Sequence, residues 1–267
     1  MKYIDCAKYA QEILDEVKAV PKKGKLVIIT VGDDSSSKVY VKGKIKDCEY
    51  CGIPVEHIQI DDSNDAGATL TFTIHKCNIN RAVAGIILQL PLPKHLNPNI
   101  YSSMIDPLKD VDGLGSDEFF KPCTPKGILH LMKKELGDLT GKDVLIIGRS
   151  NLVGKPLAKM LTDEDCTVTL AHSKTKDLCS HMECADVVVS AVGKAKEFDL
   201  GYCWSADIVI DVGINRDEDG HLCGDFFGFD EFDSFFTKVT PVPKGVGLLT
   251  RAMLMKNVAE ASERMGF

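Results

Sequence analysis

The stretch DVLIIGRSNLVGKPLAKML, residues 143–161, passes from a continuous apolar run through a turn containing glycine into a helical pattern. This order is typical of the carboxyl end of a parallel strand, where an open sheet binds a dinucleotide. Glycine lets the backbone approach phosphate, and the N–H groups at a helix N-terminus attract negative charge. Only Gly148 and Gly154 are present, so the spacing is not G-x-G-x-x-G and a tight turn without a ligand remains an alternative.

Three further apolar runs after this turn predict strands over residues 167–171, 186–193 and 207–213. Their near-continuous apolar character suits a parallel sheet that is covered on both faces. A helix is expected to open at Thr124 and Pro125, an N-cap followed by proline at the first helical position. We therefore predict a Rossmann-like NAD(P)-binding domain over residues 123–248.

The first part of the chain shows the same α/β alternation. Strands are predicted over residues 25–32, 54–60 and 82–90, and a long helix over residues 35–51 with the serines at 35–37 as N-caps. Residues 61–81 are unusually polar for a helical region, and residues 106–122 are irregular. We expect two α/β lobes with a cleft between them, because no long linker interrupts the pattern. The first lobe, residues 1–122, is expected to be completed by a terminal helix at 249–267.

Composition and charge exclude several classes of protein. The 267 residues are 44% hydrophobic and 27% charged, which is ordinary for a folded chain, and the net charge is −7. An acidic chain is a poor partner for nucleic acid or an anionic membrane, so we expect neither. The N-terminus, MKYIDCAKYAQEILDEVK, has no signal-peptide core, and no apolar run could span a bilayer. The expected location is cytoplasmic.

The ten cysteines are scattered singly, and a chain of this length builds a core without disulfides. Cys48 and Cys51 have redox spacing, and Cys179 and Cys184 lie near two histidines. A structural zinc site usually needs two close ligand pairs, which neither cluster supplies. We expect buried or half-buried free thiols and no metal.

The end of the second strand of the predicted NAD(P) domain indicates which dinucleotide binds. NAD enzymes commonly place an acid there, which binds the adenosine ribose. Here the strand ends AHSK, residues 171–174, and Arg149 stands in the phosphate turn. Arg149, Ser173 and Lys174 suit the extra 2′-phosphate of NADP, because a guanidinium group binds phosphate through two hydrogen bonds. NAD is the less favoured cofactor, and solvated loop residues are the alternative interpretation.

A second group of residues suits proton transfer. Tyr40 and Lys44 are four residues apart on the predicted helix and therefore share a face. A lysine beside an aromatic ring in an apolar site is readily desolvated, as a general base requires, whereas an exposed basic face is the alternative. Gln89 is a lone polar residue at the end of an apolar strand, able to accept from an ammonium group and donate to a substrate. Asp112, in KDVDG, could bind an amidine-like ring edge or cap its loop.

Eight motifs occur in order along the chain: VGDDSSSKVYVKGKIKDCEYCGI, GIILQLPLPKHL, DPLKDVDGL, PCTPKGI, GRSNLVGKP, TVTLAHSKT, IDVGIN and TPVPKGVGLLT. Together they resemble the bifunctional methylenetetrahydrofolate dehydrogenase/cyclohydrolase family over nearly the whole chain. The resemblance implies NADP-dependent oxidation of 5,10-methylenetetrahydrofolate, then hydrolysis of the methenyl product to 10-formyltetrahydrofolate. It also implies a folate cleft between the two lobes and, usually, a homodimer.

The resemblance assigns a role to each matched residue. Lys44 matches the catalytic lysine, Tyr40 the ring that stacks on folate, Gln89 the glutamine that orients the lysine, and Asp112 the pterin-binding carboxylate. On the cofactor side, Gly148, Arg149 and Ser150 match the phosphate turn. Ser173 matches the 2′-phosphate contact and Ile214 the nicotinamide-side contact. Gly247 and Thr250 lie in a segment that passes close to the nicotinamide in the family.

The sequence departs from the family pattern at two places that border the expected site. The loop GLGSDEFFKPCTP after Asp112 is shorter than in the family and lacks its asparagine, which bears on folate affinity. Lys244 and Leu248 replace a glycine and a proline, and Lys244 either adds charge near the cofactor phosphate or points to solvent. Three alternatives remain: a family member with one activity or with NAD, a shikimate-dehydrogenase-like oxidoreductase, and a folate-binding module without turnover.

Overall fold

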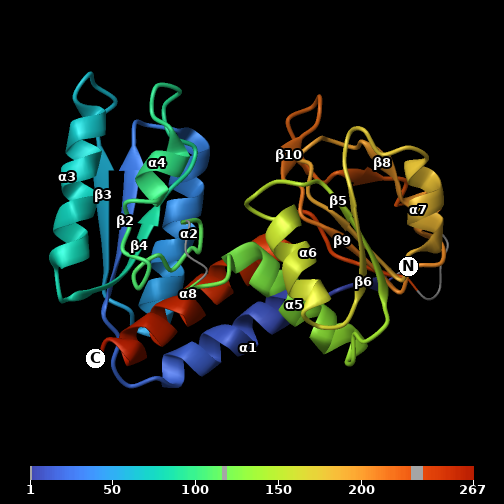
Figure 1. The fold of residues 1–267 in the computed structure, drawn as a ribbon, viewed down its shortest axis with the longest axis horizontal. Helices are drawn as coiled ribbons and strands as arrows, with labels where there is room; N and C mark the ends of the chain where they lie inside the picture. Colours follow the sequence, from blue (N-terminus) through green and yellow to red (C-terminus); the bar gives the residue numbers. More distant parts are fainter. Residues whose placement is uncertain (1, 116–118, 230–236) are drawn as a thin grey trace. The chain divides into compact units, whose positions relative to one another are not determined.

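The computed structural model describes residues 2–115, 119–229 and 237–267, and the chain divides into two compact units. One comprises Gln11–Cys123 and Arg251–Phe267, and the other Met1–Ala10 and Thr124–Thr250. We name them the three-stranded unit and the six-stranded unit after their main parallel sheets. Figure 1 shows both as strands flanked by helices. The predicted two-domain α/β fold is therefore confirmed.

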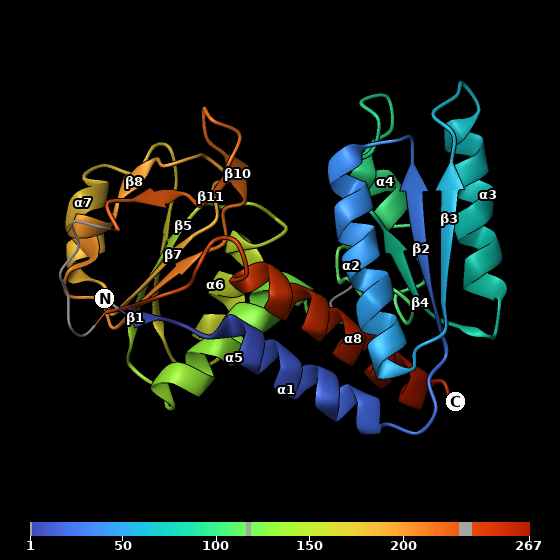
Figure 2. The same cartoon turned by 180° about the vertical axis from the view of Figure 1, so that it is seen from behind.

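The three-stranded unit has the strand order β3–β2–β4. Its elements are β2 (Lys25–Val31), α2 (Ser35–Cys51), β3 (Val55–Ile60), α3 (Ala66–Ile79), β4 (Val83–Leu88) and α4 (Pro98–Ser102), with parts of α1 (Cys6–Ala19) and α8 (Val246–Arg264). The chain moves outward from β2 to β3 and then back to β4, so right-handed crossovers place α2 and α3 on opposite faces. Figure 2 shows this arrangement. The polar segment 61–81 thus folds largely as α3, which buries Leu70 and Ile74 against the sheet.

The start of α2 differs from the prediction in its capping residue. The helix begins at Ser35, but the N-cap is Asp34, whose carboxylate accepts a 2.8 Å hydrogen bond from the backbone N–H of Ser37. The prediction of serine N-caps is wrong because an aspartate one residue earlier takes that position. Likewise α5 (Cys123–Leu136) starts two residues before Pro125, the predicted first helical residue, which puts Thr124 inside the helix.

The six-stranded unit has the strand order β1–β13–β9–β7–β5–β6, with every neighbouring pair parallel. The strands are β1 (Lys2–Tyr3), β5 (Asp143–Ile147), β6 (Thr167–Ala171), β7 (Val187–Ser190), β9 (Ile208–Asp211) and β13 (Lys238–Val239). The helices are α5, α6 (Gly154–Thr162), α7 (Leu178–Cys184) and the 3₁₀ helix η1 (Leu200–Cys203). The chain leaves β5 for β6 on one side and returns to β7 on the other, which makes the carboxyl end of β5 a topological switch point.

Two short ladders complete this unit. β10 (Asn215–Arg216) pairs antiparallel with β11 (Leu222–Cys223), and β8 (Phe198–Asp199) pairs parallel with β12 (Phe226–Phe227). The edge strand β1 was not expected, because two residues carry no sequence pattern and the strand forms only by pairing with β13. The terminal helix α8 begins at Val246, three residues before the predicted start.

All ten cysteines are free thiols, as predicted. Burial raises the pKa of Cys48 to about 12, so this thiol is far from a reactive thiolate. Cys184 is exposed, so the expectation of a buried or half-buried thiol is wrong there. Among the described residues, no helix has the length and apolar character required to cross a membrane.

Candidate active site

Lys44 and Gln89 meet within the three-stranded unit. Lys44 lies midway along α2 and is 8% exposed, and its Nζ donates a 3.0 Å hydrogen bond to Oε1 of Gln89. Gln89 directly follows β4, and its backbone N–H donates to the carbonyl of Ile29 at 2.9 Å. Its side-chain Nε2 donates to the carbonyl of Leu90 at 2.8 Å. These contacts leave the amide oxygen facing the lysine.

The ion pair between Arg251 and Asp47, which sequence reasoning missed, lies beside this lysine. Arg251 Nε of α8 is 2.9 Å from Oδ2 of Asp47, three residues after Lys44 on α2. A Cβ on Gly43 would lie 2.0 Å from Nη1 of Arg251, so the glycine gives the guanidinium room against α2. Burial raises the pKa of Asp47, while Arg251 acts in the opposite direction. The sequence signal that could have found this ion pair is Asp47 itself, a carboxylate three residues after Lys44 on the same predicted helix.

Tyr40 is one helical turn before Lys44. Its side chain is 38% exposed, and burial raises the pKa of its phenol. The preceding Val39 is 71% exposed, and the side chains of Lys42 and Lys46 are also exposed, elsewhere on the helix. A half-exposed aromatic ring on the face of α2 that carries Lys44 offers a flat surface for stacking.

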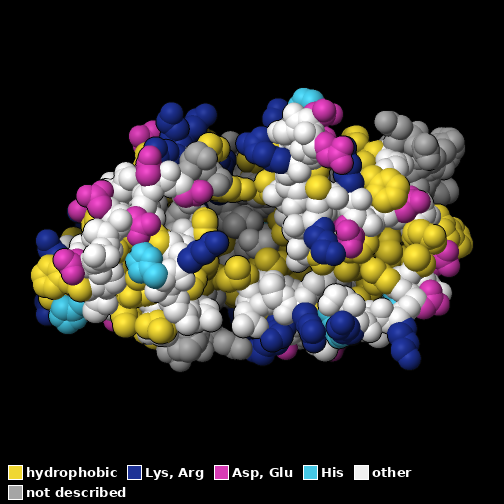
Figure 3. Space-filling view, turned by 90° about the horizontal axis from the view of Figure 1, so that it is seen from above, with side chains coloured by type: hydrophobic (Ala, Val, Ile, Leu, Met, Phe, Trp, Pro, Cys, Tyr) yellow, Lys and Arg dark blue, Asp and Glu magenta, His cyan; other side chains and the backbone are white. Residues whose placement is uncertain are grey.

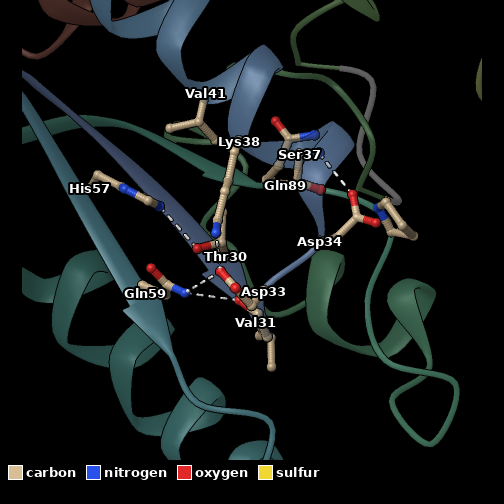
Figure 4. A pocket seen from close by; sticks show the side chains of 12 residues that line it. Thr30, Val31, Asp33, Asp34, Ser37, Lys38, Val41, His57, Gln59 and Gln89 are labelled. Carbon is tan, nitrogen blue, oxygen red and sulfur yellow. Dashed lines mark hydrogen bonds and ion pairs between the residues drawn. The ribbon is translucent and has the colours of Figure 1, made fainter.

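A small cavity borders Gln89 at the N-terminal end of α2 (Figure 4). Its volume is about 20 Å³, which is room for a single water molecule. In its wall Thr30 Oγ1 lies 2.9 Å from His57 Nε2, and Gln59 donates to the carbonyl of Gly32 at 3.1 Å. The hydroxyl of Ser37 also lines it, is buried, and has no hydrogen-bond partner among the described residues.

The loop that carries Asp112 is held in place by Lys109 and Asp110, the two charged residues that precede Asp112. Lys109 is 3% exposed, and its Nζ donates to three carbonyls at the end of α3, those of Cys77, Asn78 and Asn80, at 3.0, 2.6 and 2.8 Å. The carboxylate of Asp110 accepts from the backbone N–H groups of residues 113 and 115 at 3.2 and 2.6 Å. Asp112 is half-buried, and its carboxylate makes no hydrogen bond or ion pair with the described residues.

In the six-stranded unit, a pocket of about 560 Å³ opens where the phosphate turn was expected. Four of the predicted cofactor residues line it together: Gly148, Arg149, Ser150 and Ser173. Gly148 has φ +116°, and a Cβ on Gly154 would lie 1.8 Å from the carbonyl oxygen of Gly148. The turn between β5 and α6 is therefore so tight that only glycines fit, and its backbone is open to a phosphate. The residues fit a bound dinucleotide.

The end of β6 carries no acidic side chain. After Ala171, the backbone N–H of His172 donates to Thr175 Oγ1 at 2.8 Å, and His172 Nδ1 accepts from the N–H of Lys174 at 3.1 Å. The pocket does contain Glu197, but its carboxylate is paired with Lys194 at 2.8 Å. Arg149 is exposed at the pocket, so the free charge near this end of β6 is positive.

The remaining predicted cofactor residues lie outside this pocket. Ile214 is 47% exposed, and its Cδ1 is 3.7 Å from the position that a Cβ on Gly247 would take, so these two residues are neighbours. Thr250 Oγ1 lies 3.0 Å from Thr124 Oγ1 and donates to the carbonyl of Val246 at 3.1 Å. Its hydroxyl is therefore already bonded within the unit.

One cluster within the described residues has metal-ligand spacing. The side chains of Asp217, Asp219 and His221 come within 4.8 Å of one another near the β10–β11 hairpin. Lys196 pairs with Asp217 at 3.1 Å, and the other two side chains are exposed. Exposed acidic groups of this kind are ordinary surface features, and nothing at the hairpin points to an ion.

Two family models match the chain. The tetrahydrofolate dehydrogenase/cyclohydrolase catalytic domain matches residues 4–112, and the NAD(P)-binding domain of the same name matches residues 122–266. The chain is 42% identical over 265 residues to the bifunctional protein FolD of Agathobacter rectalis, covering 95% of this chain and 94% of that one.

Solved structures agree with the family models. The bifunctional enzyme FolD of Campylobacter jejuni superposes with a TM-score of 0.90 at 36% identity, covering 97% and 98% of the two chains. The Trypanosoma brucei methylenetetrahydrofolate dehydrogenase-cyclohydrolase, solved with NADP cofactor and an inhibitor, gives 0.87 at 28% identity, covering 98% and 97%. These similarities extend over both units.

Proposed function

The chain belongs to the tetrahydrofolate dehydrogenase/cyclohydrolase family, and from this membership we infer that it is a bifunctional one-carbon enzyme. It oxidises 5,10-methylenetetrahydrofolate to 5,10-methenyltetrahydrofolate and hydrolyses that product to 10-formyltetrahydrofolate. The observation that carries the proposal is the hydrogen bond between Lys44 and Gln89, because it sets a buried amine beside an oriented amide in the unit that matches the catalytic domain.

The oxidation depends mainly on position. The bridging carbon of the substrate lies between two nitrogens, so loss of hydride leaves a cation that both nitrogens stabilise. NADP, when bound, accepts that hydride. The chain contributes alignment, which lowers the barrier by pre-ordering the reactants. We assign Tyr40 to stacking on the folate ring system, and Asp112, whose carboxylate has no hydrogen-bond partner in the described chain, to the donor edge of the pterin.

The hydrolysis requires proton transfer. Water adds to the methenyl carbon and releases a first proton to solvent, which leaves a neutral carbinol. The bond from that carbon to N5 then breaks as the formyl C=O forms, and the remaining hydroxyl proton passes to N5. We assign the acceptance and return of this proton to Lys44 Nζ. Gln89 is a positioning residue: its Nε2 is held by the carbonyl of Leu90, so its oxygen keeps the amine in place.

We assign cofactor binding to the pocket at the carboxyl ends of β5 and β6, with NADP preferred over NAD. Gly148 and Ser150 would hold the phosphates at the N-terminus of α6, and Arg149 with Ser173 would hold the 2′-phosphate. The lack of an acid at the end of β6 supports this choice, since a carboxylate there would repel the extra phosphate. Ile214, Gly247 and Thr250 are assigned to the nicotinamide side.

An absorbance assay with 5,10-methylenetetrahydrofolate and either NADP or NAD tests these assignments together. We expect reduced dinucleotide with NADP, a slower rate with NAD, and methenyl absorbance that decays faster than its spontaneous hydrolysis. A chain that reduces neither dinucleotide is not a dehydrogenase. Methenyl absorbance that persists would show that the chain has no cyclohydrolase activity. Faster turnover with NAD than with NADP would reverse the cofactor assignment.

We further propose a cytoplasmic homodimer without metal, nucleic-acid or membrane partners. The net charge of −7 supports the last two points, as does the surface in Figure 3, where Lys and Arg are interspersed with Asp and Glu on the face drawn. Light scattering should report twice the chain mass of 29.2 kDa. A mass equal to one chain would contradict the dimer.

A further inference from the structure

Asp225 has a carboxylate on which five hydrogen-bond donors converge. The residue lies between β11 and β12 and is fully buried. Its Oδ2 accepts from Ser190 Oγ at 2.8 Å, from the N–H of Val192 at 3.0 Å and from that of Gly193 at 3.3 Å. Its Oδ1 accepts from the N–H of Lys194 and from Asn215 Nδ2, both at 2.9 Å.

These donors belong to the segments that shape the cofactor site. Residues 191–194 follow the carboxyl end of β7, and Ala191, Val192 and Lys194 line the pocket that contains Arg149. Asn215 directly follows Ile214, the residue assigned to the nicotinamide side. One carboxylate thus joins the pocket-lining loop to the segment carrying Ile214.

A second buried carboxylate holds Asp225 itself. Asp211, the last residue of β9, is 1% exposed, and its Oδ1 accepts from the N–H groups of Gly213 and Asp225 at 2.9 and 3.0 Å. Its Oδ2 accepts from the N–H of Phe226 at 3.1 Å. A Cβ on Gly213 would lie 2.2 Å from Asp225 Oδ1, so the glycine lets the chain pass against the carboxylate. Hydrogen bonds therefore run from the sheet through Asp211 and Asp225 to the pocket.

We propose that Asp225 is a positioning residue for the dinucleotide, which it serves by fixing loop 191–194 and Asn215 in the geometry that binds NADP. The inference rests on the proposed function. Its chemical basis is that every partner of Asp225 donates, so the position needs an acceptor-only group. An asparagine would turn its NH₂ group toward at least one of these donors and leave that donor unpaired.

The test uses the Asp225→Asn variant with Asp186→Asn as the matched control. Asp186 accepts one backbone N–H, that of Asp143 at 2.9 Å, at the amino edge of the same sheet. Hydrolysis of added methenyltetrahydrofolate needs no dinucleotide, so it reports on the residues assigned to folate binding and proton transfer. For Asp225→Asn we expect the KM for NADP to rise at least tenfold and the hydrolysis rate to stay within twofold. The control should change neither.

A structural role alone would give a different result: both activities would fall together with the melting temperature, and the KM for NADP would stay near that of the unmodified chain. Either that outcome or an unchanged KM in a folded Asp225→Asn protein overturns the proposal. If this variant does not fold, Asn215→Ala removes one donor only, and an unchanged NADP affinity by calorimetry would then be decisive against it. Failure of the proposed function is distinguishable, because it would show as absent dinucleotide reduction by the unmodified chain.

Discussion

Gln89 presents its amide oxygen to Lys44, at 3.0 Å from Nζ, because its amide nitrogen is already bonded to the carbonyl of Leu90. The orientation of the glutamine is thus set by the backbone after β4 rather than by the lysine. An acceptor in this position holds the Nζ of a buried lysine in one place. The pair therefore gives α2 a fixed amine for proton transfer.

Lys44→Met should lower the rate of methenyl hydrolysis by about 10²-fold or more, the usual contribution of a proton-transfer group. Oxidation of the methylene substrate should fall less, because hydride transfer needs alignment rather than a base. Lys42→Met is the control, since Lys42 is an exposed lysine on the same helix. The two rates are measured separately, one from added methenyl substrate and one from dinucleotide reduction. An equal loss of both would contradict the assignment.

Lys109→Met should weaken folate binding. The substitution removes the donor to three carbonyls at the end of α3 and frees the loop that carries Asp112. Unpaired buried carbonyls cost about 1–3 kcal/mol each, so the loop should shift toward solvent. We expect the KM for 5,10-methylenetetrahydrofolate to rise about tenfold, the equivalent of roughly 1.4 kcal/mol. Lys25→Met, which breaks an exposed ion pair with Glu56, should leave it unchanged. A wild-type KM in folded Lys109→Met would refute the loop's dependence on this lysine.

Lys244→Gly should stabilise the chain. Lys244 is exposed and has φ +74°, a left-handed conformation that costs a residue with a Cβ about 1–2 kcal/mol. Glycine relieves this strain but adds entropy to the unfolded state, so the net gain in unfolding free energy should be about 0.5–1 kcal/mol. Lys94→Gly, at an exposed turn residue without positive φ, should destabilise instead. Urea unfolding measures both, and equal effects would argue against strain at Lys244.

Sequence patterns predicted the elements whose residues carry a period or an apolar run. The strands β2, β4, β5 and β7 and the helix α2 fall where they were expected. The apolar pattern that indicates a buried strand or a buried helix face lies within the element's own residues. β1 could not be predicted, since its two residues pair with β13 at the other end of the chain. The N-cap of α2 was missed because Asp34 and the serines that follow are equally good caps in sequence.

The residues of the candidate site also divide into those that the sequence predicts and those that only the fold reveals. Lys44, Gln89 and Arg149 stand in long motifs and could be singled out from the sequence. Asp225 could not, because an acid after a short apolar segment looks like any loop carboxylate until its donors, at residues 190, 192–194 and 215, are brought to it by the fold. Arg251 was missed for the same reason: its partner Asp47 is on α2, far away along the chain.

The buried carboxylate of Asp211 also predicts how stability changes with pH. Burial raises the pKa of Asp211 from 3.8 to about 6, against the effect of its backbone hydrogen bonds. The folded state therefore binds a proton more tightly than the unfolded chain, and between about pH 4 and pH 6 stability falls as the pH rises. A shift of this size corresponds to about 3 kcal/mol. Asp138 should act in the opposite direction, because its hydrogen bonds with Thr140 lower the pKa of its carboxyl.

Asp211→Asn removes the titrating group, so the difference in unfolding free energy between the unmodified chain and this variant should shrink by up to about 3 kcal/mol from pH 4 to pH 7. The asparagine loses acceptor capacity toward the N–H groups of Gly213, Asp225 and Phe226, and the variant should be less stable at every pH in this range. Only the pH dependence of the difference separates titration from that lost bonding. Urea unfolding at half-unit intervals measures it. A constant difference would mean that Asp211 stays ionised throughout, because the backbone N–H groups that surround it outweigh its burial.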